Sequence, residues 1–219
     1  MFRNRRQAGK LLARKLKEFK RKKDVIVVGI TRGGVVVAGE ISSFLKLPLD
    51  IIVIKKIGAP QNPELAIGAI GPNGVVFWDE GLIRRLNIGE EYKNHLKEIK
   101  NLERAELEHF LRRGKSIGKL RTSKSINVKN KKIILVDDGV ATGATVLCAV
   151  KFFRKEKSKE VILAIPVIAK DTSLSIKKYF DTVVTLQIEG ELYAIGQFYR
   201  EFPQVENREV IQLINGKSE

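Results

Sequence analysis

The sequence predicts an α/β fold with a mostly parallel central sheet and helices on both faces. Short apolar runs of a length typical of buried strands recur along the chain: 24–30, 49–54, 133–136, 160–168 and 182–188. Most of these runs are followed by a helical pattern rather than by a tight hairpin, an alternation that favours parallel strands. Two of the runs end in glycine-bearing turns, and ligands of open parallel sheets bind beyond the carboxyl ends of the strands. We therefore expect one ligand site to contain both turns.

An amphipathic helix is expected over residues 2–20. Apolar side chains recur there at helical spacing, with Lys and Arg on the opposite face: Ala8, Leu11, Leu12, Leu16 and Phe19. The favoured interpretation is a helix docked on the protein with its basic face in solvent. The alternative is a basic arm that lies near a substrate or RNA.

The first predicted strand, 24–30, ends in the sequence TRGG at 31–34, and a helical pattern resumes over 35–45. The paired glycines permit backbone angles that other residues rarely adopt. Arg32 carries several N–H donors that suit a diphosphate group. Such a turn by itself is weak support for a diphosphate site, but a second strand-end turn follows later in the chain.

The second predicted strand, 49–54, is followed by Lys55 and Lys56. Their ammonium groups stand where they could neutralise an anionic leaving group, and a role as ordinary surface lysines is weighed equally. Residues that break regular structure follow and predict a loop: Gly58, Pro60, Asn62 and Pro63.

A hairpin and a helical segment are expected as an insertion at about 66–130. Two short apolar runs, 66–70 and 75–78, flank the turn sequence GPNG, which is a hairpin signal. Apolar positions at helical spacing continue amid dense charge over 79–114, with a break at 87–89. The insertion is expected to serve as a lid or as an association surface.

The central motif is IILVDDGVATGAT, residues 133–145. Four aliphatic residues form a buried strand, and two adjacent carboxylates, Asp137 and Asp138, follow where it ends. The small residues of the next turn let a phosphate approach the backbone, and the helix that opens near Ala144 supplies N–H groups and partial positive charge. The pattern predicts a site for a phosphorylated sugar, whose neighbouring hydroxyls would donate to the two acids. A generic turn with a solvated acid pair is disfavoured, since adjacent carboxylates repel unless a ligand uses them.

This motif resembles the phosphoribosyl-pyrophosphate (PRPP) motif of type I phosphoribosyltransferases, with an apolar strand, two acids and small residues around Thr-Gly-x-Thr in the same order. The resemblance implies the type I phosphoribosyltransferase fold, with a small hood and a mobile loop near the hairpin. It further implies that PRPP binds with Mg²⁺ and that ribose 5-phosphate passes to a nitrogen acceptor, expected to be a nucleobase, with release of pyrophosphate. The Mg²⁺ would be held mainly through PRPP and water, with no direct protein ligand.

The resemblance and the strand-end positions together assign the expected roles. Asp137 and Asp138 would hold the ribose hydroxyls and, with Lys56, make up the catalytic set. The PRPP-binding set contains the first turn, the other strand-end lysine and the whole central turn: Arg32, Gly33, Gly34, Lys55, Asp137, Asp138, Gly139, Val140, Ala141, Thr142, Gly143, Ala144 and Thr145.

Two residues depart from the family pattern. Ala141 stands where enzymes acting on hypoxanthine or guanine carry an Asp near the base, so the motif is closer to those of adenine and orotate enzymes. Gly139 is smaller than the usual branched residue at its place. A looser similarity over FRNRRQAGKLLARKL, KKIGAPQNPELAIGAI and AIGQFYREFPQVENREV points to a branch of phosphoribosyltransferases whose acceptor is not established. The acceptor pocket would lie near Phe198 and Tyr199, although a structural role is favoured for these rings.

The length of 219 residues suits one domain, 1–219, better than two. The one cysteine, Cys148, excludes an intramolecular disulfide and is expected to pack in the core. The chain has no run of 18 apolar residues, and its first residues lack the apolar stretch of a signal peptide. We expect a cytoplasmic protein without a membrane partner, present as a homo-oligomer, a dimer.

The formal net charge is +16. Residues 1–24 contain eleven Lys/Arg against two acids, and residues 79–132 contain fifteen against eight. Such an excess is typical of nucleic-acid binding, of a polyanionic substrate or of a heat-adapted composition. It supports a rival hypothesis to the favoured enzyme, namely a non-catalytic PRPP or nucleotide sensor, or an RNA-binding regulator, on the same fold. A nucleotide triphosphatase is disfavoured, because the chain contains no GxxxxGK[ST] loop.

Overall fold

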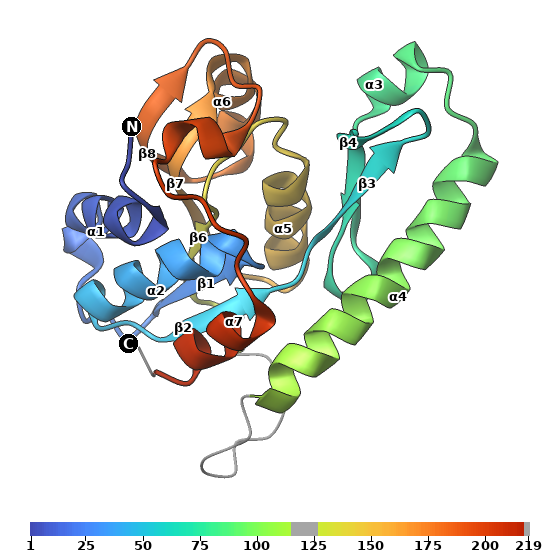
Figure 1. The fold of residues 1–219 in the computed structure, drawn as a ribbon. Helices are drawn as coiled ribbons and strands as arrows, with labels where there is room; N and C mark the ends of the chain where they lie inside the picture. Colours follow the sequence, from blue (N-terminus) through green and yellow to red (C-terminus); the bar gives the residue numbers. More distant parts are fainter. Residues whose placement is uncertain (115–126, 217–219) are drawn as a thin grey trace.

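The structure is a computed structural model that describes residues 1–114 and 127–216. It is organised around a five-stranded, fully parallel sheet (Figure 1), whose strands are, in spatial order, β2 (Leu49–Ile52), β1 (Val25–Ile30), β6 (Lys132–Val136), β7 (Glu160–Ala169) and β8 (Thr182–Glu189). The five apolar runs of the sequence form these strands, so the predicted α/β fold class is confirmed.

Helices cover both faces of this sheet. Their bounds are α1 (Arg5–Lys15), α2 (Gly33–Leu45), α5 (Ala144–Lys155), α6 (Lys170–Ile176) and α7 (Asn207–Ile214), with short 3-10 helices η1 (Lys17–Phe19), η2 (Pro72–Gly74), η3 (Lys177–Tyr179) and η4 (Ile195–Phe198). On one face, Leu12 of α1 and Val37 of α2 share a buried cluster with Ile134. On the other face, Phe153 of α5 is buried in a cluster with Val28. The expected docking of the N-terminal helix through its apolar side is thereby confirmed.

Between β2 and β6 the chain leaves the central sheet. It forms a three-stranded antiparallel sheet and two helices: β3 (Lys55–Ala59), β4 (Asn62–Ile70), β5 (Val76–Trp78), α3 (Glu80–Arg85) and α4 (Glu90–Gly114). Figure 1 shows α4, in pale green, running along this small sheet on the side away from α5. The predicted hairpin around 71–74 and the predicted break at 87–89 are both present. Residues 115–126 of the expected insertion lie outside the described residues.

The prediction of a loop around residues 58–63 is wrong, because strand pairing already begins at Lys55. β3 pairs with β4 across a turn at 60–61, and the register shifts on both sides of Gly58. A Cβ at Gly58 would overlap the Pro63 carbonyl, so the glycine lets the two strands approach at this irregularity. Residues that break regular structure in the sequence are thus accommodated by a bulged hairpin.

Among the described residues, no helix is both long enough and apolar enough to cross a membrane.

Candidate functional site

The two strand-end turns meet at one cavity. β1 and β6 are parallel neighbours, with Gly29 beside Val136, so the turns that follow these strands lie next to each other. The cavity measures about 300 Å³. Its lining comes from both turns, from the chain between β2 and β3 and from one residue near the C-terminus: Ile30, Thr31, Arg32, Gly33, Ile54, Lys56, Asp137, Asp138, Gly139, Val140, Ala141, Thr142, Gly143, Thr145 and Ile195.

The acid pair follows directly after β6 and lines this cavity. The backbone N–H of Asp138 donates to Asp137 Oδ1 at 2.9 Å. Burial raises the pKa of Asp137 well above its ordinary value, the Asp138 carboxylate raises it further, and Lys56 opposes both effects. The two carboxyl groups therefore offer oxygen acceptors to a polyhydroxy ligand, and a protonated Asp137 can also donate.

The backbone of the central turn is held by the end of β7 and the start of α6. The N–H of Val140 donates to the Val167 carbonyl at 2.9 Å, and the N–H of Ala169 donates to the Val140 carbonyl at 3.0 Å. The Thr172 hydroxyl donates to the carbonyl of Ala141. These bonds place the turn without any contribution from a ligand.

The central turn ends at the N-terminus of α5. Gly143 is the N-cap residue of this helix and has φ +82°, in the left-handed region that favours glycine. Among the described residues, no side chain caps the helix there, so its first N–H groups carry partial positive charge toward the turn. The hydroxyls of Thr142 and Thr145 belong to residues that line the same cavity. Together these donors suit a phosphate group.

Both glycines of the first turn are needed because the two turns are in contact. A Cβ at Gly33 would overlap the Asp138 carboxylate. A Cβ at Gly34 would lie 2.7 Å from the Val136 carbonyl oxygen and 2.8 Å from Asp137 Cα. A side chain at either position would push the acid pair away from the first turn.

Thr31 and Arg32 present polar groups at the cavity, and the peptide bond between them is cis. The Thr31 hydroxyl is buried and has no hydrogen-bond partner within residues 1–114 and 127–216. The Arg32 guanidinium likewise makes no ion pair in the part of the chain that the structure describes. The Arg32 side chain is therefore available to an anionic ligand, and the buried Thr31 hydroxyl beside it is left without a partner among the described residues.

Lys55 and Lys56 lie on opposite sides of β3, as successive strand residues do. Lys56 lines the cavity. Lys55 is turned away from it, and its Nζ lies 3.7 Å from Glu103 Oε2 of α4. The pleat of the strand thus brings one of the two expected lysines to the site and not the other.

Two other residues of the expected binding set do not line the cavity. Gly34 stands behind the first turn in the close contact described above. Ala144 is buried at the first position of α5, where its backbone belongs to the helix N-terminus. The rest of the expected set does line the cavity: Arg32, Gly33, Lys56, Asp137, Asp138, Gly139, Val140, Ala141, Thr142, Gly143 and Thr145.

Arg5 and Ile195 contact the site, although no sequence pattern singled them out. Arg5 Nε donates to Asp138 Oδ2 at 2.7 Å, whereas the pattern of its helix assigned basic side chains to solvent. Ile195 lines the cavity beside Gly139. Each comes from a segment far from the motif in sequence, so periodicity and spacing carried no signal for either.

Tyr199 has a structural role, as favoured from the sequence. Its ring is 5% exposed and lies between Phe2 and Phe202, with centroid distances of 5.4 and 5.0 Å. Its hydroxyl donates to the backbone carbonyl of Asp138 at 2.6 Å, and burial raises the pKa of the phenol well above its ordinary value. The ring is therefore unavailable for stacking on a ligand, and the residue instead supports the acid pair.

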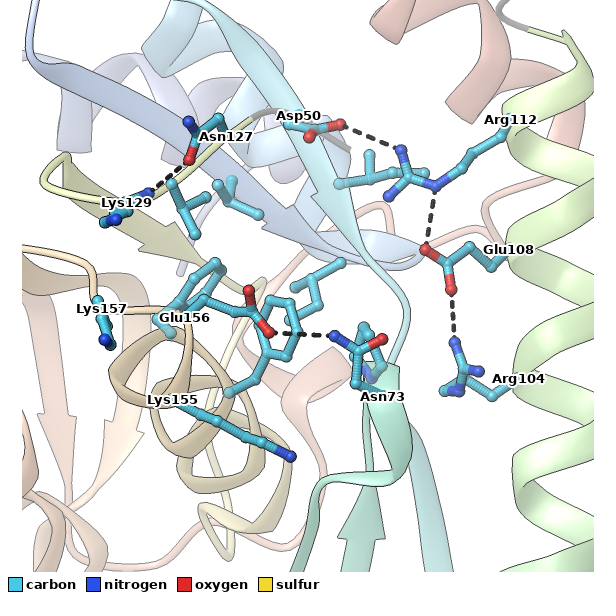
Figure 2. A pocket seen from close by; sticks show the side chains of 17 residues that line it. Asp50, Asn73, Arg104, Glu108, Arg112, Asn127, Lys129, Lys155, Glu156 and Lys157 are labelled. Carbon is cyan, nitrogen blue, oxygen red and sulfur yellow. Dashed lines mark hydrogen bonds and ion pairs between the residues drawn. The ribbon is translucent and has the colours of Figure 1, made fainter. Parts of the chain in front are cut away.

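A larger cavity of about 570 Å³ lies elsewhere, between α4 and the end of α5. Figure 2 shows Arg104, Glu108 and Arg112 of α4 on one side of it and Lys155 and Lys157 on the other. Glu108 accepts hydrogen bonds from both arginines, so this wall is internally paired. None of the expected site residues is among the described residues that line it. The strand-end cavity is therefore the candidate site.

The chain is similar to known proteins over nearly its whole length. A family model described as "Phosphoribosyl transferase domain" matches residues 3–199. Two curated Mycobacterium tuberculosis proteins, from strains CDC 1551 and H37Rv and each named "Putative phosphoribosyl transferase", are 34% identical over 215 residues, which cover 98% of this chain and 46% of each relative. The chain thus spans about half the length of the curated relatives it matches. Among solved structures, the protein TT1426 from Thermus thermophilus is 30% identical, with a TM-score of 0.78 and 100% of both chains covered.

Proposed function

The chain belongs to the phosphoribosyl transferase family, and from this premise we propose that it transfers the ribose 5-phosphate of PRPP to a nitrogen acceptor, a nucleobase, with release of pyrophosphate. The observation that carries the proposal is the meeting of two different turns in one cavity. PRPP bears a phosphate and a diphosphate on opposite sides of a ribose. A helix N-terminus, an acid pair and an arginine-glycine turn are the three kinds of partner that these parts require.

The proposed roles follow the positions in the cavity. Asp137 and Asp138 hold the ribose hydroxyls and stabilise the positive charge that develops on the ring as the diphosphate leaves. The 5-phosphate binds at the N-terminus of α5 with the hydroxyls of Thr142 and Thr145. The diphosphate binds at the first turn, where Arg32 is available, and Lys56 neutralises charge on the leaving group.

The residues present fit a Mg²⁺ ion that is held mainly by PRPP. Mg²⁺ prefers oxygen ligands and keeps several of its waters. Asp137 and Asp138 offer such oxygens at the cavity, while the described residues contain no group of three or more His, Cys, Asp or Glu that could hold a metal. When bound with PRPP, the ion would neutralise negative charge on the diphosphate.

The acceptor is proposed to enter beside Ile195. Tyr193, two residues earlier in the chain, is 84% exposed, so its ring is available to stack on a flat base. Ala141 offers no carboxylate to a base, which favours an acceptor other than hypoxanthine or guanine.

Isothermal titration calorimetry with PRPP and Mg²⁺ tests the donor half of the proposal. The wild-type protein is expected to bind, and the double variant Asp137→Asn/Asp138→Asn is expected to lose detectable binding. Asp171→Asn is the matched control, because Asp171 is an exposed carboxylate of α6, and it is expected to bind as the wild type does. Absent binding by the wild type, or unchanged binding by the double variant, contradicts the proposal.

Pyrophosphate release over a panel of purines, pyrimidines and small amines tests the transfer half. Turnover with one base is expected and identifies the acceptor. PRPP binding without turnover on any acceptor, together with an RNA affinity that falls steeply with salt, would favour the regulatory alternative.

A further inference from the structure

The N-terminal segment pairs with residues 198–200 beside the acid pair. The N–H of Phe2 donates to the Phe198 carbonyl at 2.7 Å, and the N–H of Arg200 donates to the Phe2 carbonyl at 2.9 Å. In Figure 1 the dark blue N-terminal segment and the red segment before α7 lie side by side. This pairing fixes where α1 begins, and it brings Arg5, in the first turn of the helix, to Asp138.

Arg5 is buried and is contacted by three different groups. Its Nε donates to Asp138 Oδ2 at 2.7 Å, and its Nη1 donates to the Pro203 carbonyl at 2.8 Å. Its guanidinium carbon lies 3.6 Å from the centroid of the Phe202 ring. A planar guanidinium can satisfy two divergent acceptors while its face covers a ring, which a lysine ammonium cannot do.

We infer that Arg5 is a positioning residue of the proposed PRPP site and acts through Asp138. Asp138 lines the cavity, whereas Arg5 is absent from the described residues that line it. By binding Oδ2, Arg5 sets the rotation of the carboxylate and leaves Oδ1 for a ribose hydroxyl. Tyr199 holds the backbone of the same residue, so the side chain and main chain of Asp138 are both fixed by these two paired segments. The inference rests on the proposed function.

The guanidinium also offsets negative charge at the site. Two adjacent carboxylates would face a ligand that carries several phosphate charges, and like charges repel strongly where water is excluded. Arg5 is close to both turns, since a Cβ at Gly33 would lie 3.0 Å from its Nε. It therefore places one positive charge between the acid pair and the diphosphate turn.

PRPP titrations of Arg5 variants test the inference. Arg5→Met removes the donors and is expected to weaken binding about tenfold to hundredfold, the range of one charged hydrogen bond. Arg5→Lys keeps the charge but lacks the planar, forked set of N–H donors, and its PRPP affinity is expected to lie between those of Arg5→Met and the wild type. Arg6→Met is the control: Arg6 lies on the same helix, its nitrogens are 3.5 and 3.6 Å from Glu40 and Glu209, and its loss is expected to change binding by less than about twofold.

A double-mutant cycle on PRPP affinity separates positioning from structural damage. If Arg5 acts through Asp138, Arg5→Met is expected to weaken binding by less than about threefold when Asp138 is already replaced by Asn. Arg6→Met is expected to leave PRPP affinity unchanged in both backgrounds. Arg32 and Lys56, the other cations at the cavity, are present in every variant. Circular dichroism gives the folded fraction to which each affinity is referred.

The outcomes can be told apart. If the wild type does not bind PRPP, the proposed function fails and the inference fails with it. If the wild type binds and Arg5→Met binds as Arg6→Met does, the inference alone is overturned. An Arg5→Met loss that is equally large in the Asp138→Asn background has the same meaning, because Arg5 then does not act through Asp138. If Arg5→Met does not fold, Arg5→Lys takes its place in the cycle: a wild-type affinity overturns the inference, and a loss seen only when Asp138 is present supports it.

Discussion

The side chain of Ile195 occupies the space beside Gly139. A Cβ at Gly139 would lie 2.6 Å from Ile195 Cγ2 and 3.0 Å from Val167 Cγ1. Related motifs carry a branched residue at the place of Gly139, whereas here a branched side chain reaches the same wall of the cavity from η4. The small residue in the motif and the isoleucine near the C-terminus are therefore complementary.

Gly139→Ala is expected to displace Ile195 and to weaken PRPP binding. Overpacking of this kind costs about 1–3 kcal/mol, which in a chain of this size lowers the Tm by about 2–4 °C per kcal/mol. The double variant Gly139→Ala/Ile195→Ala removes the clash and is expected to recover much of the Tm. Gly190→Ala is the control, because nothing lies within 4 Å of a Cβ there. A double variant less stable than Gly139→Ala would refute the complementarity.

Asp137→Asn is expected to raise the Tm at neutral pH while it weakens PRPP binding. Folding raises the pKa of Asp137, so the folded protein holds this proton more tightly than the unfolded chain. Stability therefore falls once the pH exceeds the unfolded value of about 3.9, because the unfolded chain releases this proton first, and the loss grows until the pH passes the raised pKa of the folded protein. Thermal unfolding between pH 4 and pH 8 is expected to show a Tm difference from the wild type that widens with pH. A constant difference, or one that narrows as the pH rises, would count against this account.

Lys56→Met and Lys55→Met form a matched pair of neighbouring substitutions. Lys56 lines the cavity, so its loss is expected to weaken PRPP binding by about tenfold and to reduce the salt dependence of binding. Lys55 lies beside Glu103, so Lys55→Met is expected to leave PRPP affinity unchanged. Calorimetry at two salt concentrations measures both effects. Equal losses in the two variants would show that the pleat of β3 does not separate these lysines in solution.

The thiol of Cys148 is expected to be unreactive in the folded protein. Cys148 is fully buried, its Sγ lies 3.4 Å from the Val75 carbonyl oxygen, and burial raises the pKa of the thiol to about 12. Little thiolate is therefore present at pH 8, and a reagent has no access to it. Labelling with a chromogenic disulfide is expected only after unfolding in guanidinium chloride. Rapid labelling of the native protein would contradict the buried position.

The parts of the protein that could be predicted are those with a local physical signature. Apolar runs predicted the strands of the central sheet, since a strand buried on both faces needs apolar residues throughout. The acid pair, Gly139, Gly143 and the start of α5 all lie within residues 133–145, so this one stretch was enough to predict a turn suited to a phosphorylated sugar. The hairpin at 55–70 was missed at its beginning, because its glycine and prolines predict a loop and pairing with β4 overrides that preference.

Local patterns were thus sufficient for the fold class and for the two strand-end turns that line the cavity, since strand, turn and helix N-terminus are consecutive in the chain. The partners of the motif required the folded chain. Arg5 reaches Asp138 because Phe2 pairs with residues 198–200, Ile195 reaches Gly139 from η4, and Lys56 faces the cavity because of the phase of the β3 pleat. Each of these contacts joins segments that are distant in sequence, and their relative placement depends on packing of the whole domain rather than on the residues next to them.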